Sequence, residues 1–176
     1  MKPYRCAHYI LNKRFVLRVR CFILILFSFF PSLSLANQFQ EGLDAIHETN
    51  YEVALKKLLP LAATGHSAAQ YNLGVMSEWG NGVPKDYTEA LKWYKLSAEG
   101  SHRDAQNNLG AMYSKGEGTD QSFVEALKWL VISSENGSEA GRKNIDILEK
   151  RMTSEQITKA RKLARKWTKK HRENRL

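Results

Sequence analysis

Cysteine is nearly absent from this chain. The 176 residues include two cysteines, Cys6 and Cys21, and both lie within the first 21 positions. Residues 22–176 therefore contain no thiol and cannot form a disulfide. A folded domain in that part of the chain has to be stable without one, even in an oxidising compartment.

Catalytic and metal-binding motifs are missing as well. The sequence has no Ser-x-x-Lys, Ser-Asp-Asn or Lys-Thr-Gly, the motifs of serine β-lactamases. Neither His66 nor His102 has a second metal ligand three or four residues further on. No Gly-Lys-Ser/Thr follows the paired glycines Gly80 and Gly82, so a phosphate-binding loop is not indicated. We expect a protein that is not an enzyme, with no cofactor, metal or small-molecule substrate; a β-lactamase-like hydrolase is the least favoured function.

The N-terminal residues have the layout of a secretory signal peptide. Lysines and arginines without any acidic residue precede the apolar run Phe22–Phe30. A proline then interrupts the run, and the small residues Ser34 and Ala36 predict cleavage after Ala36. The alternative is an uncleaved membrane anchor, but a spanning helix needs about 20 apolar residues and this segment is shorter. We expect residues 1–36 to be a signal peptide and the protein to be periplasmic or secreted.

The formal net charge of +9 is unevenly distributed along the chain. Residues 1–36 hold 6 Lys/Arg and no acidic residue, so their removal leaves a net charge of +3. Residues 37–141 hold 8 Lys/Arg against 14 Asp/Glu, a net charge of −6, whereas residues 142–176 hold 13 against 4, a net charge of +9. The processed chain is therefore acidic over most of its length and basic at its C-terminal end.

A sequence pattern recurs at an interval of 36 residues. Leu73-Gly74 returns as Leu109-Gly110, and Ala90-Leu91-Lys92-Trp93 returns as Ala126-Leu127-Lys128-Trp129. A fixed period of this length is typical of stacked supersecondary units, each of which needs its neighbours to bury its apolar face. The sequence predicts an all-α solenoid of about three helix-turn-helix repeats whose exposed surface binds a partner.

Each repeat carries signals for the start of its second helix. Asn50, Asp86 and Ser122 are 36 residues apart and are favoured N-cap types. Glu89 and Glu125 follow two of them by three residues and complete the capping-box pattern.

Glycines mark other points of the repeat. A glycine inside a helix costs about 1 kcal/mol relative to alanine, so Gly74 and Gly110 indicate the close approach of a neighbouring helix. Gly65, Gly100 and Gly137 are predicted to close the second helices. Their spacing would make the second helix of the middle unit one residue short.

The first and last units are irregular. A leading helix is expected over residues 39–47, and Thr153-Ser-Glu-Gln156 starts a final helix whose apolar stripe seals the last repeat. The predicted segments are the signal peptide 1–36, an irregular first repeat 37–66, full repeats 67–102 and 103–138, and C-terminal capping helices with a basic end, 139–176.

The repeat residues closely resemble the Sel-one-like repeat, a relative of the tetratricopeptide repeat. The resemblance rests on Leu73-Gly74, Gly80-Asn-Gly82-Val83-Pro84, Asp86-Tyr87, Ala90, Trp93-Tyr94 and Gly100. It covers nearly all of residues 38–168 and implies a right-handed superhelix that acts as an adaptor for other proteins. For secreted bacterial members it further implies a part in envelope assembly, signalling or host contact.

The tetratricopeptide layout, taken over by resemblance, turns eight side chains of the first helices toward a concave groove. They are Tyr71, Val75, Glu78, Trp79, Asn107, Ala111, Ser114 and Lys115. Trp79 and Tyr71 are the expected anchors for a protein or peptide, because aromatic residues dominate interface energetics. Packing between units is the alternative role for both.

An alternative function is attachment to the cell envelope through the basic C-terminal helix, with the repeats as a spacer. Charge attraction would hold that helix to anionic lipid or a cell-wall polymer and would weaken with salt. The residues concerned are Lys159, Arg161, Lys162, Arg165, Lys166, Lys169 and Lys170. The solvated side of a capping helix also explains them, and no nucleic-acid partner is expected of a secreted protein.

Overall fold

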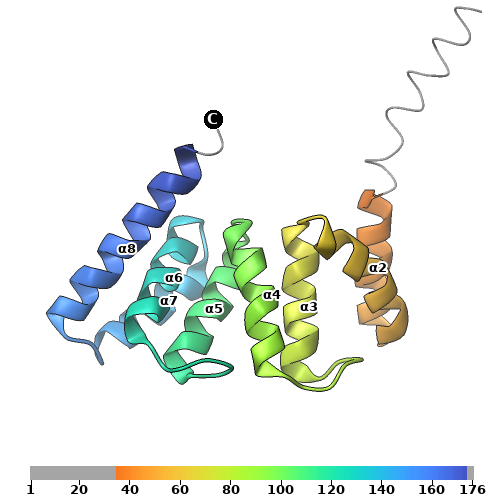
Figure 1. Ribbon diagram of the computed structural model, residues 1–176, viewed down its shortest axis with the longest axis horizontal. Coiled ribbons are helices and arrows are strands. Elements are labelled where there is room, and N and C mark those ends of the chain that lie inside the picture. Colours follow the sequence, from red (N-terminus) through yellow and green to blue (C-terminus); the bar gives the residue numbers. More distant parts are fainter. Residues whose placement is uncertain (1–34, 174–176) are drawn as a thin grey trace, which may run out of the picture. The chain divides into compact units, whose positions relative to one another are not determined.

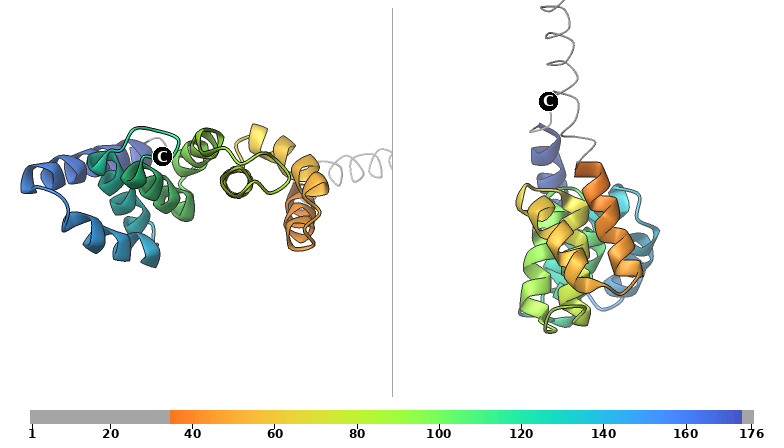
Figure 2. Two further views of the ribbon diagram at one scale, coloured as in Figure 1. Left: turned by 90° about the horizontal axis from the view of Figure 1, so that it is seen from below. Right: turned by 90° about the vertical axis from the view of Figure 1, so that its right-hand side faces the viewer.

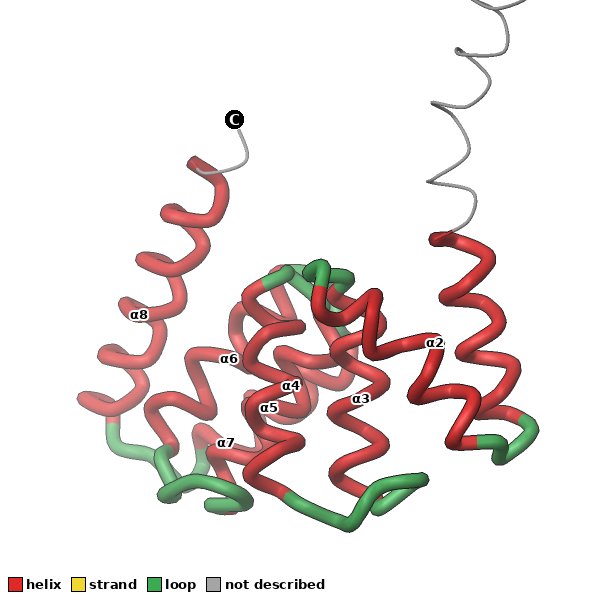
Figure 3. The backbone as a smooth tube through the Cα atoms, turned by 45° about the vertical axis from the view of Figure 1, so that its right-hand side comes forward, coloured by secondary structure: helices red, strands yellow, loops and turns green. Residues whose placement is uncertain are grey.

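Every regular element in the described part of the chain is a helix. The computed structural model describes residues 35–173, of which 35–47 are helical, and the helices that follow are labelled in Figure 1. They are α2 (Tyr51–Ala63), α3 (Ser67–Trp79), α4 (Tyr87–Glu99), α5 (Arg103–Lys115), α6 (Phe123–Glu135), α7 (Glu139–Glu149) and α8 (Ser154–Glu173). Figure 3 shows them joined by loops, with no strand in residues 35–173. The all-α prediction is confirmed, whereas residues 1–34 of the predicted signal peptide lie outside the described residues.

Two units make up the chain, residues 1–40 and residues 41–176. The described part of the first, residues 35–40, is helical. The repeats belong to the second unit, and the features below are all features of that unit.

The helices of residues 41–173 pack in the order in which they follow along the chain. α3 pairs with α4, and α5 pairs with α6, in helix-turn-helix units that can be followed in Figure 1 and from two further directions in Figure 2. α2 packs on α3, α4 on α5, and α7 on α6, and α5 also contacts α7. Contacts restricted to neighbouring repeats are the defining property of a solenoid, so this prediction is also confirmed.

Gly74 and Gly110 let the two helices of each repeat approach closely. A Cβ atom on Gly74 would lie 2.7 Å from the Tyr94 ring, and one on Gly110 would lie 2.8 Å from Leu130. Non-bonded carbon atoms prefer about 3.5–4.0 Å. The predicted reason for these two helical glycines is therefore correct, and the side chains that use the space, Tyr94 and Leu130, belong to the buried core.

The predicted N-caps of the second helices are confirmed. Side-chain oxygens of Asn50, Asp86 and Ser122 accept backbone N–H groups in the first turns of α2, α4 and α6. The strongest cap is that of Asp86, whose Oδ1 accepts from Thr88 at 2.8 Å and from Glu89 at 3.1 Å. These bonds satisfy donors that a helix start leaves without partners.

The reciprocal half of the predicted capping box is not formed in α4 or α6. The backbone N–H of Asp86 donates to the carbonyl of Ser77 at 2.9 Å, and that of Ser122 donates to the carbonyl of Tyr113 at 2.8 Å. Each N–H is thus already used by the preceding helix of its repeat. The carboxylate of Glu89 pairs with Lys92 instead.

The predicted ends of the second helices are right in two repeats and wrong in the middle one. Gly65 and Gly137 have φ values of 90° and 88°, which favour glycine. Gly100 has a φ of −72° and is the C-cap, while Ser101 takes the left-handed conformation with a φ of 66°. α4 is 13 residues long, as are α2 and α6, and is not one residue short. Position 100 requires a glycine for another reason, because a Cβ atom there would lie 2.8 Å from the Cβ of Ser67.

Histidines cap the first helices of the two full repeats. Nδ1 of His66 accepts the N–H of Ala69 at 3.2 Å, and Nδ1 of His102 accepts the N–H of Ala105 at 3.3 Å. Ser138 caps α7 from the equivalent position. A ring nitrogen that accepts a hydrogen bond carries no proton, so both histidine caps require Nδ1 in its unprotonated form.

α8 packs mainly against α6 and closes the row of repeats. Ala160 is fully buried, and the ring of Trp167 meets that of Trp129 edge-on with centres 5.5 Å apart. A complete capping box starts the helix, because the N–H groups of Thr153 and Gln156 each donate to the side chain of the other residue, at 3.0 and 3.2 Å. The predicted capping role of this helix is confirmed.

Candidate partner-binding surface

α3, α5 and α7 begin at equivalent positions, because their N-caps His66, His102 and Ser138 are 36 residues apart. Residues at that interval therefore form rows across the three helices. The predicted groove residues stand at i, i+4, i+7 and i+8 of α3 and α5, which is one side of a helix. We call the surface that they form with their α7 counterparts the first-helix face. Its rows are Tyr71, Asn107 and Lys143; Val75, Ala111 and Ile147; Glu78, Ser114 and Lys150; and Trp79, Lys115 and Arg151.

Two large apolar side chains on the first-helix face lie open to solvent. Trp79, the last residue of α3, is 67 % exposed, and Ile147 of α7 is 62 % exposed. No other large hydrophobic side chain in residues 35–173 is as exposed as these two. Complete burial of Trp79 would have ruled out its predicted role as an anchor, and it is not buried.

Tyr71 is partly buried and takes part in packing between repeats. Its ring stacks on that of His102 with centres 4.6 Å apart and lies 5.9 Å from the ring of Tyr94. Burial, together with the nearby carboxylates of Asp104 and Glu78, raises the pKa of its hydroxyl. Of the two predicted anchors, Tyr71 thus joins α3 to the start of α5, and Trp79 presents most of its surface to solvent.

Glu78 is held by the core of its own repeat. The hydroxyl of Tyr94 donates to Oε2 of Glu78 at 2.6 Å, and Tyr94 is fully buried. Burial and this hydrogen bond raise the pKa of the Tyr94 hydroxyl. The carboxylate of Glu78 is therefore held by the buried Tyr94.

The predicted residues of α5 lie along its contact with α7. Nδ2 of Asn144 donates to Oδ1 of Asn107 at 2.9 Å and joins the two helices. A cleft of about 160 Å³ lies along the same contact. It is lined by Ala111, Ser114, Lys115, Leu130, Asn144, Ile147, Leu148 and Arg151.

The sequence-based site omits the α7 side of this cleft. Ile147 and Arg151 follow Ala111 and Lys115 by 36 residues, so one more step of the repeat finds them. α7 is less recognisable as a first helix because Ile145-Asp146 stands where the other two have Leu-Gly. The glycine is not needed there, because α8 packs mainly on α6 and not on α7.

All seven predicted basic residues of α8 are exposed. Arg161 donates to Oε1 of Glu149 from both Nε (3.1 Å) and Nη2 (2.6 Å), and Nζ of Lys169 lies 3.9 Å from Glu173. Within residues 35–173, the remaining five make no ion pair: Lys159, Lys162, Arg165, Lys166 and Lys170. Their charges face solvent and are open to an anionic surface.

Other kinds of site were sought in the same residues. In the described part of the chain, no three or more His, Cys, Asp or Glu side chains gather so that they could bind a metal ion. Over the same residues, no helix combines the length and the apolar character needed to cross a membrane. The pKa values that shift through burial are those of Tyr71, Tyr94 and His102, which pack repeats together or cap a helix.

Comparison with known proteins finds Sel1 repeats in this chain. The Sel1 repeat model matches residues 67–102 and 103–138. The chain is similar to the solved structure of c5321, a protective antigen present in uropathogenic Escherichia coli strains that displays an SLR fold, with 31 % identity and a TM-score of 0.74. It is also similar to a Sel1 repeat protein from Oxalobacter formigenes, with 28 % identity and a TM-score of 0.59. No curated protein matches the chain.

Both solved relatives are longer than the matching region. The first match covers 78 % of this chain and 30 % of the antigen, and the second covers 70 % of this chain and 53 % of the Oxalobacter protein. Sel1-repeat proteins are generally scaffolds for protein–protein interaction and are typically non-catalytic. The chain thus contains two Sel1 repeats, at residues 67–102 and 103–138, and matches a solved structure with the SLR fold.

Proposed function

We propose that this protein is a non-enzymatic scaffold of the bacterial cell envelope that binds a protein or peptide segment on the first-helix face. The observation that carries the proposal is the position of Trp79 and Ile147. They are the two most exposed large hydrophobic side chains of residues 35–173, and both stand on this one face. Large exposed side chains such as tryptophan are enriched among the residues that anchor interfaces.

Trp79 is the stronger anchor of the two. A tryptophan buries about 150–250 Å² when it is enclosed, and this side chain is 67 % exposed. A partner that covered the exposed part would gain about 2.5–4 kcal/mol at 25 cal/mol per Å², before the entropy lost on association is subtracted. Tryptophan is also enriched among the few residues that dominate interface energies.

The envelope location rests on the N-terminal sequence. The basic segment, the apolar run and the small residues before Asn37 are those of a secretory signal. A chain exported in this way would fold where disulfides form, and residues 37–176 need none because they contain no cysteine. We therefore place the partner in the periplasm or outside the cell.

Co-purification from gently crosslinked cells tests the scaffold function. The tagged protein is compared with two variants, Trp79→Ala on the first-helix face and Leu96→Ala on α4, where another large apolar side chain is 52 % exposed. We expect a partner that mass spectrometry finds with the parent protein and with Leu96→Ala, and that falls at least tenfold with Trp79→Ala. Equal recovery with both variants, each folded by circular dichroism, would contradict the assignment of the site to Trp79.

The exposed basic residues of α8 favour one further function, attachment of the protein to an anionic envelope surface. Each lysine or arginine near an anionic membrane contributes about 1 kcal/mol at physiological ionic strength. Lys159, Lys162, Lys166 and Lys170 make no ion pair within residues 35–173, and all four are exposed. The repeats would then serve as a spacer that presents the first-helix face.

Sedimentation with anionic vesicles and with purified cell wall tests this second function. We expect binding at 0.05 M salt that is lost at 0.5 M, and that is also lost when the four lysines are changed to glutamate. No sedimentation at the lower salt concentration would remove the envelope-attachment function and leave the scaffold function untouched.

A further inference from the structure

The cleft between α5 and α7 exists because two side chains are smaller than their counterparts one repeat earlier. Leu130 and Ser114 follow Tyr94 and Glu78 by 36 residues. In the earlier repeat, the Tyr94 ring packs against Gly74 and its hydroxyl bonds to Glu78 at 2.6 Å, so the tyrosine fills the space. Leucine is shorter and has no hydroxyl, and serine has no carboxylate. The space that the tyrosine and glutamate occupy in one repeat is left open in the next.

Half of the residues that line the cleft are apolar. Its apolar lining comes from three helices and consists of Ala111, Leu130, Ile147 and Leu148. Leu130 and Leu148 are buried, whereas Ile147 is largely exposed at the mouth. A closed cavity of about 150 Å³ lined by apolar side chains binds benzene, so the volume of about 160 Å³ in this open cleft is enough for one apolar side chain.

Two cations stand beside this apolar space. Lys115 and Arg151 belong to one row of the first-helix face, and both line the cleft. Nζ of the exposed Lys115 lies 3.4 Å from the half-buried Glu117, and ion pairs near the surface contribute about 0–1 kcal/mol. A partner carboxylate can therefore replace Glu117 at little cost.

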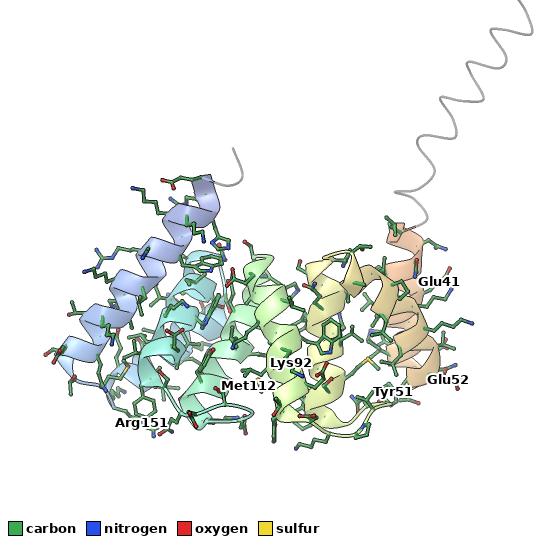
Figure 4. The ribbon with its side chains drawn as sticks, in the orientation of Figure 1. Glu41, Tyr51, Glu52, Lys92, Met112 and Arg151 are labelled. Carbon is green, nitrogen blue, oxygen red and sulfur yellow. The ribbon has the colours of Figure 1, made fainter. Side chains whose placement is uncertain are left out.

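Arg151 is the less engaged of the two cations. Its guanidinium lies 4.7 Å from the centre of the Phe123 ring and makes no ion pair within residues 35–173. Figure 4 shows Arg151 at the lower edge of the view, beyond the end of α7. The ring contact holds the guanidinium in place while its N–H donors stay open to a carboxylate, which arginine binds with two parallel hydrogen bonds.

We propose that the cleft binds one apolar side chain of a partner segment whose neighbouring residue is acidic and pairs with Arg151 and Lys115. The inference rests on the scaffold function and specifies the partner's chemistry: an acidic protein segment with an apolar anchor. Charge complementarity selects this occupant. The basic region of residues 142–176, with 13 Lys/Arg against 4 Asp/Glu, begins at the α7 side of the cleft and favours acidic ligands.

Selection of peptides from a random phage-displayed library tests the inference, with the immobilised full chain as bait. Three variants are panned in parallel. Ser114→Glu/Leu130→Tyr fills the cleft by copying the preceding repeat, Lys115→Glu/Arg151→Glu reverses the charge at its rim, and Leu96→Ala is the matched control on α4. The rim residues are exposed, so that variant keeps its fold even if the filled variant does not, and circular dichroism checks both.

We expect the parent chain and Leu96→Ala to enrich peptides that carry Leu, Ile, Met or Phe within two residues of Asp or Glu. Enrichment of these peptides should fall at least tenfold on the filled variant and on the charge-reversed variant. Their measured affinity for the parent chain should also fall at least fivefold between 0.05 and 0.5 M salt, because part of the attraction is between exposed charges.

Three outcomes overturn the inference: equal enrichment on the filled variant, enrichment of apolar peptides without acidic residues, or no enrichment on the parent chain. None of them decides the scaffold function, which co-purification with the Trp79→Ala variant tests in cells.

Discussion

Ser101 occupies a backbone conformation that favours glycine. Its φ of 66° is left-handed, and the residues at the equivalent positions of the neighbouring repeats are Gly65 and Gly137. In a residue with a Cβ this conformation costs about 1–2 kcal/mol. The adjacent Gly100 cannot exchange places with Ser101 without a clash, because a Cβ at position 100 would lie 2.8 Å from Ser67.

Ser101→Gly should therefore stabilise the protein. We expect the free energy of unfolding to rise by about 0.5–1 kcal/mol, which is the relief of the left-handed conformation minus the greater chain entropy of glycine in the unfolded state. Urea unfolding followed by circular dichroism measures it. Gly137→Ser is the reciprocal control and should lower stability by a similar amount, because the nearest side-chain atom to a Cβ there is 3.9 Å away. No change in either variant would show that φ at this position carries no strain.

The histidine cap of α5 is expected to make that helix sensitive to acid. His102 caps α5 through an unprotonated Nδ1. Burial is the main cause that lowers its pKa; the neighbouring Arg103 acts in the same direction and Asp104 opposes it. In the unfolded chain the imidazole titrates near its ordinary pKa of about 6.5. The unfolded state therefore takes up the proton first, and the stability that this group provides is present above about pH 6.5 and is lost as the pH falls toward the lower folded-state pKa.

The variant His102→Ser separates the acid response of His102 from that of the other titrating groups. Serine keeps a capping oxygen, as Ser138 does at α7, and does not titrate. We expect the loss of unfolding free energy between pH 7.5 and pH 5.0 to be smaller in the variant than in the parent chain. The comparison uses only the change in unfolding free energy between the two pH values, because the variant loses the ring contact with Tyr71 at both of them. Equal losses would mean that His102 is not the group that responds to acid.

Trp167 joins the last helix to the repeats through several contacts. Trp167 of α8 lies edge-on to Trp129 of α6 and stacks on His171, and its indole N–H donates to Oε2 of Glu99 at 3.2 Å. Trp167→Ala should lower the free energy of unfolding by about 2–3 kcal/mol, somewhat less than the loss of a fully buried tryptophan. Because contacts in a solenoid are between neighbours, hydrogen exchange should increase in α8 and stay unchanged in α3.

Trp79→Ala is the matched control for that prediction, since it removes the same side chain from an exposed position. Its effect on unfolding free energy should be below about 0.5 kcal/mol. Faster exchange throughout α2–α8 in the Trp167 variant would contradict the view that the repeats respond locally.

Elements of this fold follow from short-range signals in the sequence, and those signals predicted them well. Asp86 and Ser122 are capping residues by chemistry, and Gly74 and Gly110 mark close helix contacts. The sequence places the end of α4 wrongly because a glycine has two separate uses: Gly100 is needed for its small size and does not have a positive φ. His66 and His102 were not recognised as caps, since imidazole is not among the favoured N-cap types.

The candidate site was harder to predict, because it depends on packing between repeats. The ring of Tyr71 stacks on that of His102, whereas Trp79 stays mostly exposed, and the distances between residues of α3 and α5 decide this difference. The cleft arises from a difference in size between Tyr94 and Leu130, which occupy the same position in successive repeats. No sequence motif indicates such a difference in size. The cleft that results from it is recognised only in the three-dimensional structure.

Across the whole molecule, the first-helix face combines two features that differ in character. Trp79 stands on α3 beside the acid Glu78, whereas the cleft near Arg151 is lined with apolar groups and flanked by cations. A partner that contacts both has to cross α5, so an extended segment fits better than a single inserted side chain. The charge of the chain changes sign in the same direction, from −6 over residues 37–141 to +9 over residues 142–176. The acidic part of the partner should therefore lie toward α7.

Site-specific photo-crosslinking in living cells tests the central claim, that this protein binds a partner through the first-helix face. A photoreactive amino acid is placed at position 79 in one variant and at position 96 of α4 in the other, which compares two exposed apolar positions. We predict a covalent adduct with a specific protein from position 79 and none from position 96. Adducts of equal yield from both positions, or from neither, would contradict the claim.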